Sequence, residues 1–302
     1  MSIPIERLER DIATAAPPIT VEAFESFLQC ETKSKLYFQG AAETDFEFKK
    51  WLRRERDCFK EGGLSWLRTM CQGDQFCVGT PSVEALKQKR WRIIADYVAT
   101  SAEICAHLDA LELTRATPYR MVSFYRPLRF VPSEKLTGAD RLLLAFDALA
   151  ISHTMGKTPA NGKIIHGSKY RAAVIPLSKL VGKARTIVNK IAAQRAEITP
   201  ALPILNKHCV GCEFRSHCRQ IALQKDDLSL LPTVTKKERK MQNDKGILTV
   251  NQLSYAFRPR RCSARRSLKS LKCLEKIADT NTSVGCRCVC VRIVFGFHGH
   301  RR

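Results

Sequence analysis

Three cysteines, Cys209, Cys212 and Cys218, lie close together in a C-x2-C-x5-C spacing. Three thiolates this near to one another can bind a metal centre, but they leave it one ligand short of the four that tetrahedral zinc sites and iron–sulfur clusters use. Cys30, far upstream in the chain, is the best candidate for the fourth ligand. A centre built in this way would join two distant parts of one domain. Its binding would also stabilise that domain, because metal binding supplies folding free energy.

The kind of metal follows from the ligand types. Four thiolates suit a [4Fe–4S] cluster. Zinc sites more often show two close pairs of ligands, whereas this chain has one close trio and one distant cysteine. We therefore expect a [4Fe–4S] cluster, with zinc as the alternative and the absence of any metal as the third possibility. His208 and His217 flank the trio and are the alternative zinc ligands, although we expect them to be solvated loop histidines.

Composition favours a polyanionic partner. The chain has a formal charge of +22 and a pI near 9.7, and nucleic acid is the commonest partner of so basic a protein. Twelve Lys and Arg against two Asp and Glu after residue 257 account for +10 of this charge. A merely soluble basic protein is the plainer alternative.

The same composition bears on compartment. The chain has no apolar run long enough to span a bilayer and no apolar signal sequence, which predicts a cytoplasmic protein without a membrane partner. Without a secretion signal, its thirteen cysteines indicate reduced thiols and metal ligation more than disulfides.

Four regions follow from changes in sequence character. We expect a flexible arm over residues 1–19 and a main domain, closed by the cysteine cluster, over residues 20–226. Residues 227–257 form a small helical segment, and residues 258–302 form a basic, cysteine-rich tail that is disordered or aberrant, as in a truncated or frameshifted product.

The hydrophobic patterns of the main domain predict helices and strands in turn. Helices are expected over 21–29, 45–60 (ending at a Gly-Gly pair), 139–155 and 178–197, and strands over 91–98, 104–108, 125–131, 163–166 and 171–177. This alternation predicts an α/β sandwich.

The small helical segment resembles a helix–hairpin–helix. A charged helix over 236–243 precedes a Lys245-Gly246-Ile247 turn and a second helix. A glycine-bearing turn of this kind can present backbone N–H groups to a phosphate, so Lys245 and Gly246 are candidate nucleic-acid-binding residues. An ordinary helical hairpin fits the same pattern equally well.

These features together resemble a known family. The isolated cysteine, the α/β elements and the C-x2-C-x5-C cluster are similar to the iron–sulfur members of the PD-(D/E)xK nucleases, which include RecB-like nucleases, AddB-type subunits and CRISPR-associated exonucleases. The match is carried by Phe27–Tyr37, Leu143–Ala150, Gly162–Gly167 and Asn206–Arg260. It implies a restriction-endonuclease-like core with a mixed sheet flanked by helices. It also implies single-stranded DNA or duplex ends as the substrate, a helicase domain or subunit as a partner, and a role in repair, recombination or defence.

The catalytic pattern of that family is incomplete here. The family uses an Asp on one strand and an acid-x-Lys on the next to hold Mg²⁺ or Mn²⁺ and to activate water. Asp109 falls at the first position, but Arg129 and Val131 stand at the positions of the acid and the lysine. Only a bulge near the end of the strand would redirect Glu134 or Lys135 toward Asp109.

Three functional interpretations result from this departure. One is a metal-dependent DNA exonuclease whose activity is weak or absent. The second is a non-catalytic nucleic-acid-binding module that works with a helicase. The third is a remnant without independent function.

Overall fold

The computed structural model describes residues 17–40, 47–71, 73–114, 124–197, 203–232 and 234–256. Most of the predicted arm and all of the predicted tail lie outside these ranges. The chain divides into two units, residues 1–252 and 253–302, and the description below concerns the first.

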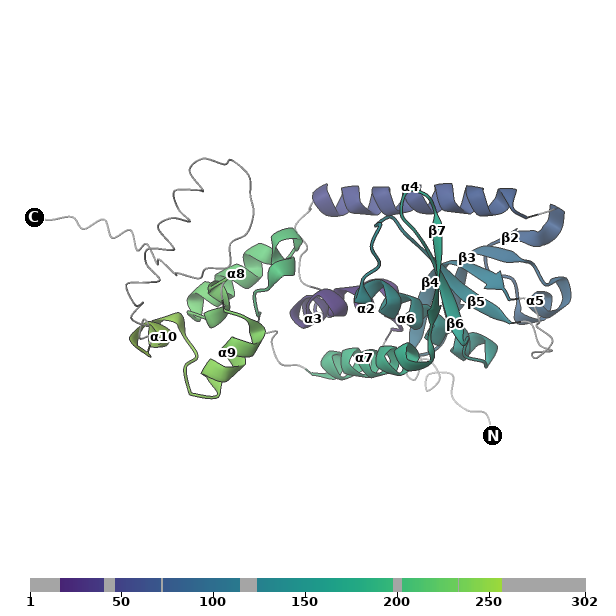
Figure 1. Cartoon of the computed structure of the whole chain (residues 1–302). Helices are drawn as coiled ribbons and strands as arrows, with labels where there is room; N and C mark the ends of the chain where they lie inside the picture. Colours follow the sequence, from purple (N-terminus) through teal and green to yellow (C-terminus); the bar gives the residue numbers. More distant parts are fainter. Residues whose placement is uncertain are drawn as a thin grey trace, which may run out of the picture. The chain divides into compact units, whose positions relative to one another are not determined.

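A mixed seven-stranded sheet forms the centre of this unit (Figure 1). Its strand order is β2-β3-β4-β5-β6-β7, and β1 pairs with β4 outside this path. The pairs β1–β4, β2–β3 and β5–β6 are parallel, whereas β3–β4, β4–β5 and β6–β7 are antiparallel. The strands are β1 (Ile19–Thr20), β2 (Phe76–Val78), β3 (Ile93–Thr100), β4 (Ile104–Leu113), β5 (Tyr125–Val131), β6 (Asn161–His166) and β7 (Arg171–Pro176).

Helices cover both faces of the sheet, so the predicted α/β class is confirmed. In Figure 1, α4 crosses above the sheet, and α6 and α7 lie below it. None of the helices in the described ranges is both long and apolar enough to cross a membrane. The α-helices are α2 (Val21–Gln29), α3 (Glu31–Phe38), α4 (Glu47–Thr69), α5 (Val83–Lys89), α6 (Gly138–Met155), α7 (Ser178–Ala196), α8 (Arg215–Gln224), α9 (Lys236–Asn243) and α10 (Val250–Ala256), and the 3-10 turns are η1 (Gly73–Gln75), η2 (Lys207–Gly211) and η3 (Leu228–Leu230).

Polar caps set the starts of two of the helices beneath the sheet, α2 and α6. The Thr20 hydroxyl accepts the Ala23 N–H at 3.3 Å and starts α2. Thr137 and Asp140 form a reciprocal capping box at the start of α6, close to residue 139, where the sequence predicts that this helix begins. These caps satisfy N–H groups that have no acceptor within the helix.

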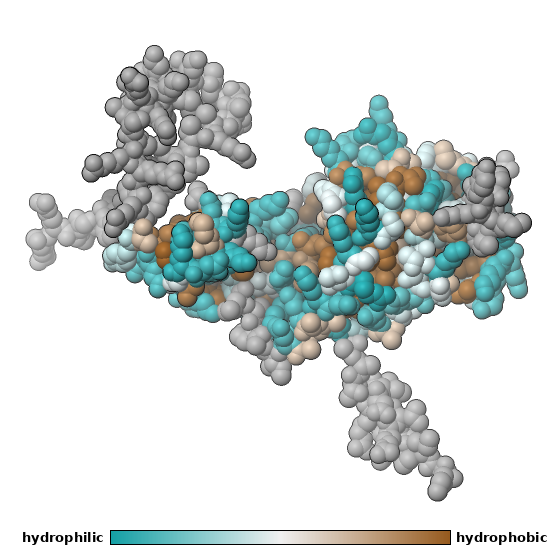
Figure 2. All heavy atoms as spheres, turned by 60° about the horizontal axis from the view of Figure 1, so that its bottom comes forward, coloured by the Kyte–Doolittle hydropathy of each residue, from teal (hydrophilic) through white to brown (hydrophobic). Residues whose placement is uncertain are grey.

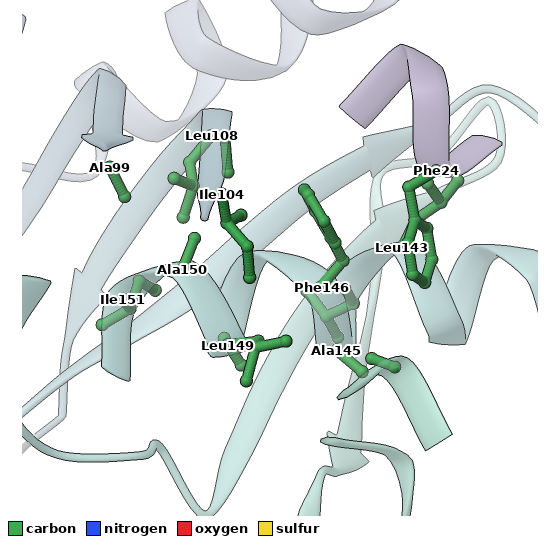
Figure 3. Close-up of a cluster of buried hydrophobic side chains, with 14 of the residues drawn as sticks. Phe24, Ala99, Ile104, Leu108, Leu143, Ala145, Phe146, Leu149, Ala150 and Ile151 are labelled. Atoms are coloured by element: carbon green, nitrogen blue, oxygen red, sulfur yellow. The ribbon is translucent and has the colours of Figure 1, made fainter. Parts of the chain in front are cut away.

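The main core lies between the sheet and helices α2, α6 and α7 (Figure 3). Its aromatic centre is the pair Phe24 and Phe146, whose ring centroids are 4.6 Å apart. Helix α6 is buried over its central part, from Leu143 to Ile151. A second, smaller core lies on the α4 side and includes Leu67, Leu128 and Phe130.

Helix α4 differs from its predicted extent. The sequence predicts an end at Gly62-Gly63, but the helix continues to Thr69. A methyl group at Gly63 would overlap the Phe130 ring, and one at Gly62 would overlap the Tyr170 hydroxyl. The prediction was wrong because these glycines serve close packing of the helix on the sheet, rather than ending the helix.

Candidate functional site

The four candidate cysteines line one pocket. Cys30 is the residue between α2 and α3, Cys209 lies in η2, Cys212 ends η2, and Cys218 lies in α8. The remaining lining residues are Gln29, Thr32, Lys33, Ile204, Asn206, His208, Phe214 and Arg215. The fold therefore brings together a cysteine and a trio that are far apart in the sequence, and metal ligation by them stays a prediction.

Local hydrogen bonds shape the cysteine loop. The Asn206 side chain accepts the His208 N–H at 2.8 Å, and the Asn206 N–H points to Cys209 Sγ at 3.3 Å. Cys218 is buried in a small cluster with Leu36 and Phe214. These contacts of the chain itself position two of the four sulfurs.

The electrostatics of the pocket favour neutral thiols when no cation is present. Burial, together with the neighbouring cysteines, raises the pKa of Cys218 to about 12. Burial also raises the pKa of Cys209 and Cys212. A bound cation would reverse this preference, because metal ligands must be deprotonated and their mutual repulsion is then neutralised.

The pocket contains the ligand types that a metal centre would need. Within the described residues, no group of three or more His, Cys, Asp or Glu is arranged to hold a metal ion. The donor set itself, four thiolates around one pocket, has the chemistry of an iron–sulfur or zinc ligand set. His208 lines the pocket with an exposed side chain, and His217 is exposed on α8 outside the lining.

Glu213 ties the cysteine loop to two helices, and sequence reasoning missed it. Its carboxylate is 2% exposed and lies 3.0 Å from Lys33 Nζ of α3 and 2.8 Å from Lys49 Nζ of α4. Burial opposes the charge, but the two lysines and a backbone N–H outweigh it and lower the pKa of Glu213 to about 2. An acidic residue inside a cysteine loop is the signal that could have indicated this role.

Asp109 lies within β4 rather than beyond its end. Its Oδ2 accepts the Phe130 N–H at 2.8 Å, and its Oδ1 lies 3.9 Å from Lys60 Nζ of α4. The register of β3 and β4 places Asp96 directly opposite, because Ala95 pairs with Ala110 and Tyr97 with Leu108. Asp96 has a left-handed φ of 55° and lies 2.5 Å from the same Lys60 Nζ.

This arrangement places one ammonium beside two carboxylates. Burial opposes the charge of Lys60, but Asp96 and Asp109 outweigh it and raise its pKa. Sequence analysis identified Asp109 but neither Asp96 nor Lys60. An isolated acid in the otherwise apolar strand 93–100 was the available signal for Asp96.

The strand after β4 does not complete the family's catalytic pattern. Arg129 makes two hydrogen bonds to the Asp147 carboxylate of α6, at 2.7 and 2.9 Å, and both residues are buried. The positive charge of Arg129 is thus neutralised within the core. Val131 is buried in the main core, where the family has its lysine.

The structure does not show Glu134 or Lys135 redirected toward Asp109. The Glu134 carboxylate accepts the Ser168 N–H and hydroxyl, both at 2.9 Å, and pairs with Arg171 at the β6–β7 turn. Among the contacts of the described residues, none joins Glu134 or Lys135 to Asp109. Glu134, the acid that the sequence proposed for this role, is therefore engaged at the β6–β7 turn.

Two helices, α9 and α10, flank the predicted turn, but the N–H groups of this turn already have acceptors within the chain. Helix α9 is followed by a turn in which Gly246 has a φ of 78°. The N–H groups of Lys245 and Ile247 donate to Gln242 O, and that of Gly246 donates to Asn243 O, at 2.9–3.0 Å. The prediction that this turn presents free N–H groups to a phosphate is wrong. Only the Lys245 side chain remains as a candidate contact.

Comparison with known proteins identifies no family, since no family model and no curated protein matches the chain. The site and fold define an α/β protein with a mixed sheet, a four-cysteine pocket and a separate cluster of paired charges.

Proposed function

We propose that this chain is a DNA-binding protein of the RecB-like nuclease type, stabilised by a structural [4Fe–4S] cluster on Cys30, Cys209, Cys212 and Cys218. The observation that carries the proposal is that these four cysteines line one pocket, although Cys30 is distant in the sequence. The proposed setting is DNA repair, recombination or defence, with a helicase domain or subunit as the partner.

The ligand types and their spacing support a cluster over zinc. Four thiolates suit a [4Fe–4S] cluster, and the four cysteines line one pocket. Zinc sites more often show two close pairs of ligands, whereas this chain has one close trio and one distant cysteine. Zinc remains the alternative metal.

The order of elements supports a restriction-endonuclease-like core. Three antiparallel strands, β3, β4 and β5, are followed by α6 and then by β6, which is parallel to β5. Asp109 lies on the middle strand of the three, where the family resemblance expects the first catalytic acid. We therefore propose that the α/β fold is a restriction-endonuclease-like core.

We infer that DNA cleavage is weak or absent. Both oxygens of Asp109 face donors of the chain itself, the Phe130 N–H and the Lys60 ammonium. Arg129 and Val131 supply neither a second carboxylate nor a lysine. A non-catalytic module is therefore the form of the proposal that the geometry supports best.

One observation favours a second candidate, an active nuclease. Asp96 and Asp109 are opposed carboxylates with a lysine between them, so they supply the same three groups as the family's motif from other positions. In that case the two acids would hold Mg²⁺ or Mn²⁺, which would polarise the phosphate and lower the pKa of water. Lys60 would have to leave the carboxylates and orient the water.

The experiment is metal and activity analysis of the full chain purified without oxygen. We expect iron and acid-labile sulfide in the wild type, loss of both in Cys209→Ser, and retention of both in the Cys58→Ser control, because Cys58 is exposed on α4. We expect DNA binding with little or no Mn²⁺-dependent cleavage. Zinc without iron would show that the four cysteines bind zinc instead of a cluster, and the absence of any metal would refute the proposed metal centre. Mn²⁺-dependent cleavage that Asp96→Asn or Asp109→Asn abolishes would establish the nuclease.

A further inference from the structure

Helix α7 contains five basic residues and no acidic residue. One of its faces packs on the main core through Ala184, Val188 and Ile191, which are fully buried. In Figure 1 the helix lies below α2 and α6, on the side of them that faces away from α4. Its other face is consequently held in a fixed orientation toward solvent.

Three lysines form one stripe on the outer face. At about 100° per residue, Lys179, Lys183 and Lys190 fall within about 40° of one another around the helix axis. All three are exposed. Thr186, also exposed, lies on the same stripe between Lys183 and Lys190, and the exposed Ala193 follows Lys190, so no large side chain interrupts or ends the row.

No carboxylate among the described residues neutralises this stripe. In the described part of the chain, no acidic group lies within ion-pair distance of any of its three lysines. The acids beside α7 are already paired, since Glu103 binds Arg185 at 2.8 Å and Glu197 binds Lys35 at 3.1 Å. Figure 2 brings the α7 side of Figure 1 forward and shows hydrophilic residues over much of it.

We propose that the α7 stripe, Lys179, Lys183 and Lys190, binds the sugar–phosphate backbone of a nucleic acid. A rise of 1.5 Å per residue separates the lysines by about 6 and about 10 Å along the axis. A straight row of cations matches a linear polyanion, and small intervening side chains allow the backbone to approach. The inference rests on the proposed function for its partner class, and it assigns the contact to a surface that no sequence motif indicated.

Two other anionic partners fit the stripe less well. A helix that binds a membrane surface inserts large apolar side chains, but the apolar face of α7 is used by the core. A protein partner needs buried aromatic or aliphatic anchors at the centre of its interface. The stripe offers only lysines, Thr186 and Ala193, so it supplies charge without such an anchor.

The test compares two triple variants of the full chain with equal changes in charge. One is Lys179→Glu, Lys183→Glu and Lys190→Glu. The control is Lys87→Glu, Arg141→Glu and Lys169→Glu, which changes exposed residues on α5, α6 and the β6–β7 turn. A third variant, with Gln at the three stripe positions, removes charge without reversing it. Circular dichroism and thermal melting verify folding of all three.

Duplex DNA binding is measured as a function of salt. We expect the Gln variant to reduce the magnitude of the negative slope of log K against log salt by up to about 2.7, because each neutralised phosphate contributes about −0.9 to that slope. The control should retain most of the wild-type slope. Equal losses in the stripe and control variants would overturn the α7 assignment and leave DNA binding intact. A wild type that binds no DNA would refute the proposed function and this inference together. Selective loss of binding to anionic phospholipid vesicles, with DNA binding unchanged, would assign the stripe to a membrane instead.

Discussion

Glu112 is a nearly buried acid on β4 that is held by two cations. Its carboxylate lies 2.7 Å from Arg126 and 2.9 Å from Lys163, on the strands that follow it in the chain. Burial alone would raise the pKa of Glu112, but Lys163 and Arg126 outweigh it and lower the pKa. The charged form of this residue therefore stabilises the fold.

The lowered pKa of Glu112 determines how the free energy of unfolding depends on pH. A carboxylate with a lowered pKa contributes its full stability above its unfolded pKa, about 4.3, and loses it as the pH falls below that value. We predict that Glu112→Gln lowers the free energy of unfolding at pH 7 by about 1–3 kcal/mol, with a smaller difference from the wild type near pH 3. Urea unfolding at both pH values measures this. An equal difference at both would show that the charge of Glu112 is irrelevant.

Single residues show what the sequence could predict about the site. The cysteines and Asp109 were found because residue type and local spacing carry their signal. Lys60, Asp96 and Asp147 were missed, since their roles depend on strand register and on helices that pack from elsewhere in the chain. A local pattern can mark such a residue, as the isolated acid in strand 93–100 does, but it does not identify the residue with which it pairs.

At the scale of elements, the glycines of α4 and α7 have opposite environments. Gly63 faces the Phe130 ring, and a methyl group there would overlap a buried aromatic side chain. Gly182 of α7 is exposed, and a methyl group there would meet no atom within 4 Å. Both residues lie in helix interiors, so helix propensity favours alanine at both positions.

We predict opposite effects of the same substitution at these two glycines. Gly63→Ala should destabilise the protein, because overpacking costs about 1–3 kcal/mol and outweighs a propensity gain of about 1 kcal/mol. Gly182→Ala should stabilise it by about 0.5–1 kcal/mol. Thermal melting of both variants beside the wild type measures the difference. Stabilisation by both would mean that α4 does not pack closely on β5.

Elements with strong local signals were predicted well. The capped starts of α2 and α6 and the strands β3 and β5 lie close to their expected positions. Helix α4 and β4 were predicted too short, because tertiary packing extends each of them beyond the point where the sequence pattern weakens. The N–H groups of the 245–247 turn show the same limit, since the residue types gave the turn but not its internal hydrogen bonds.

At the scale of the whole molecule, two packed regions differ in size. The sheet and its helices share the large main core, whereas the cysteine region has a small cluster of Leu36, Phe214 and Cys218. The cysteine region is also joined to α3 and α4 by the ion pairs of Glu213. A region with so little buried apolar surface needs another source of stability, and the proposed metal centre would supply it.

We predict that removing the metal loosens the cysteine region and leaves the sheet folded. A structural metal contributes on the order of several kcal/mol, and this contribution should act on the elements that carry the four cysteines. Hydrogen exchange of anaerobically purified protein, before and after iron chelation, should show faster exchange in α3 and α8 and unchanged exchange in β3 and β4. The Cys58→Ser variant should respond to chelation as the wild type does. Unchanged exchange in α3 and α8 after complete metal loss would refute a structural role. Loss of protection in β3 and β4 as well would mean that the metal supports the whole fold rather than one region of it.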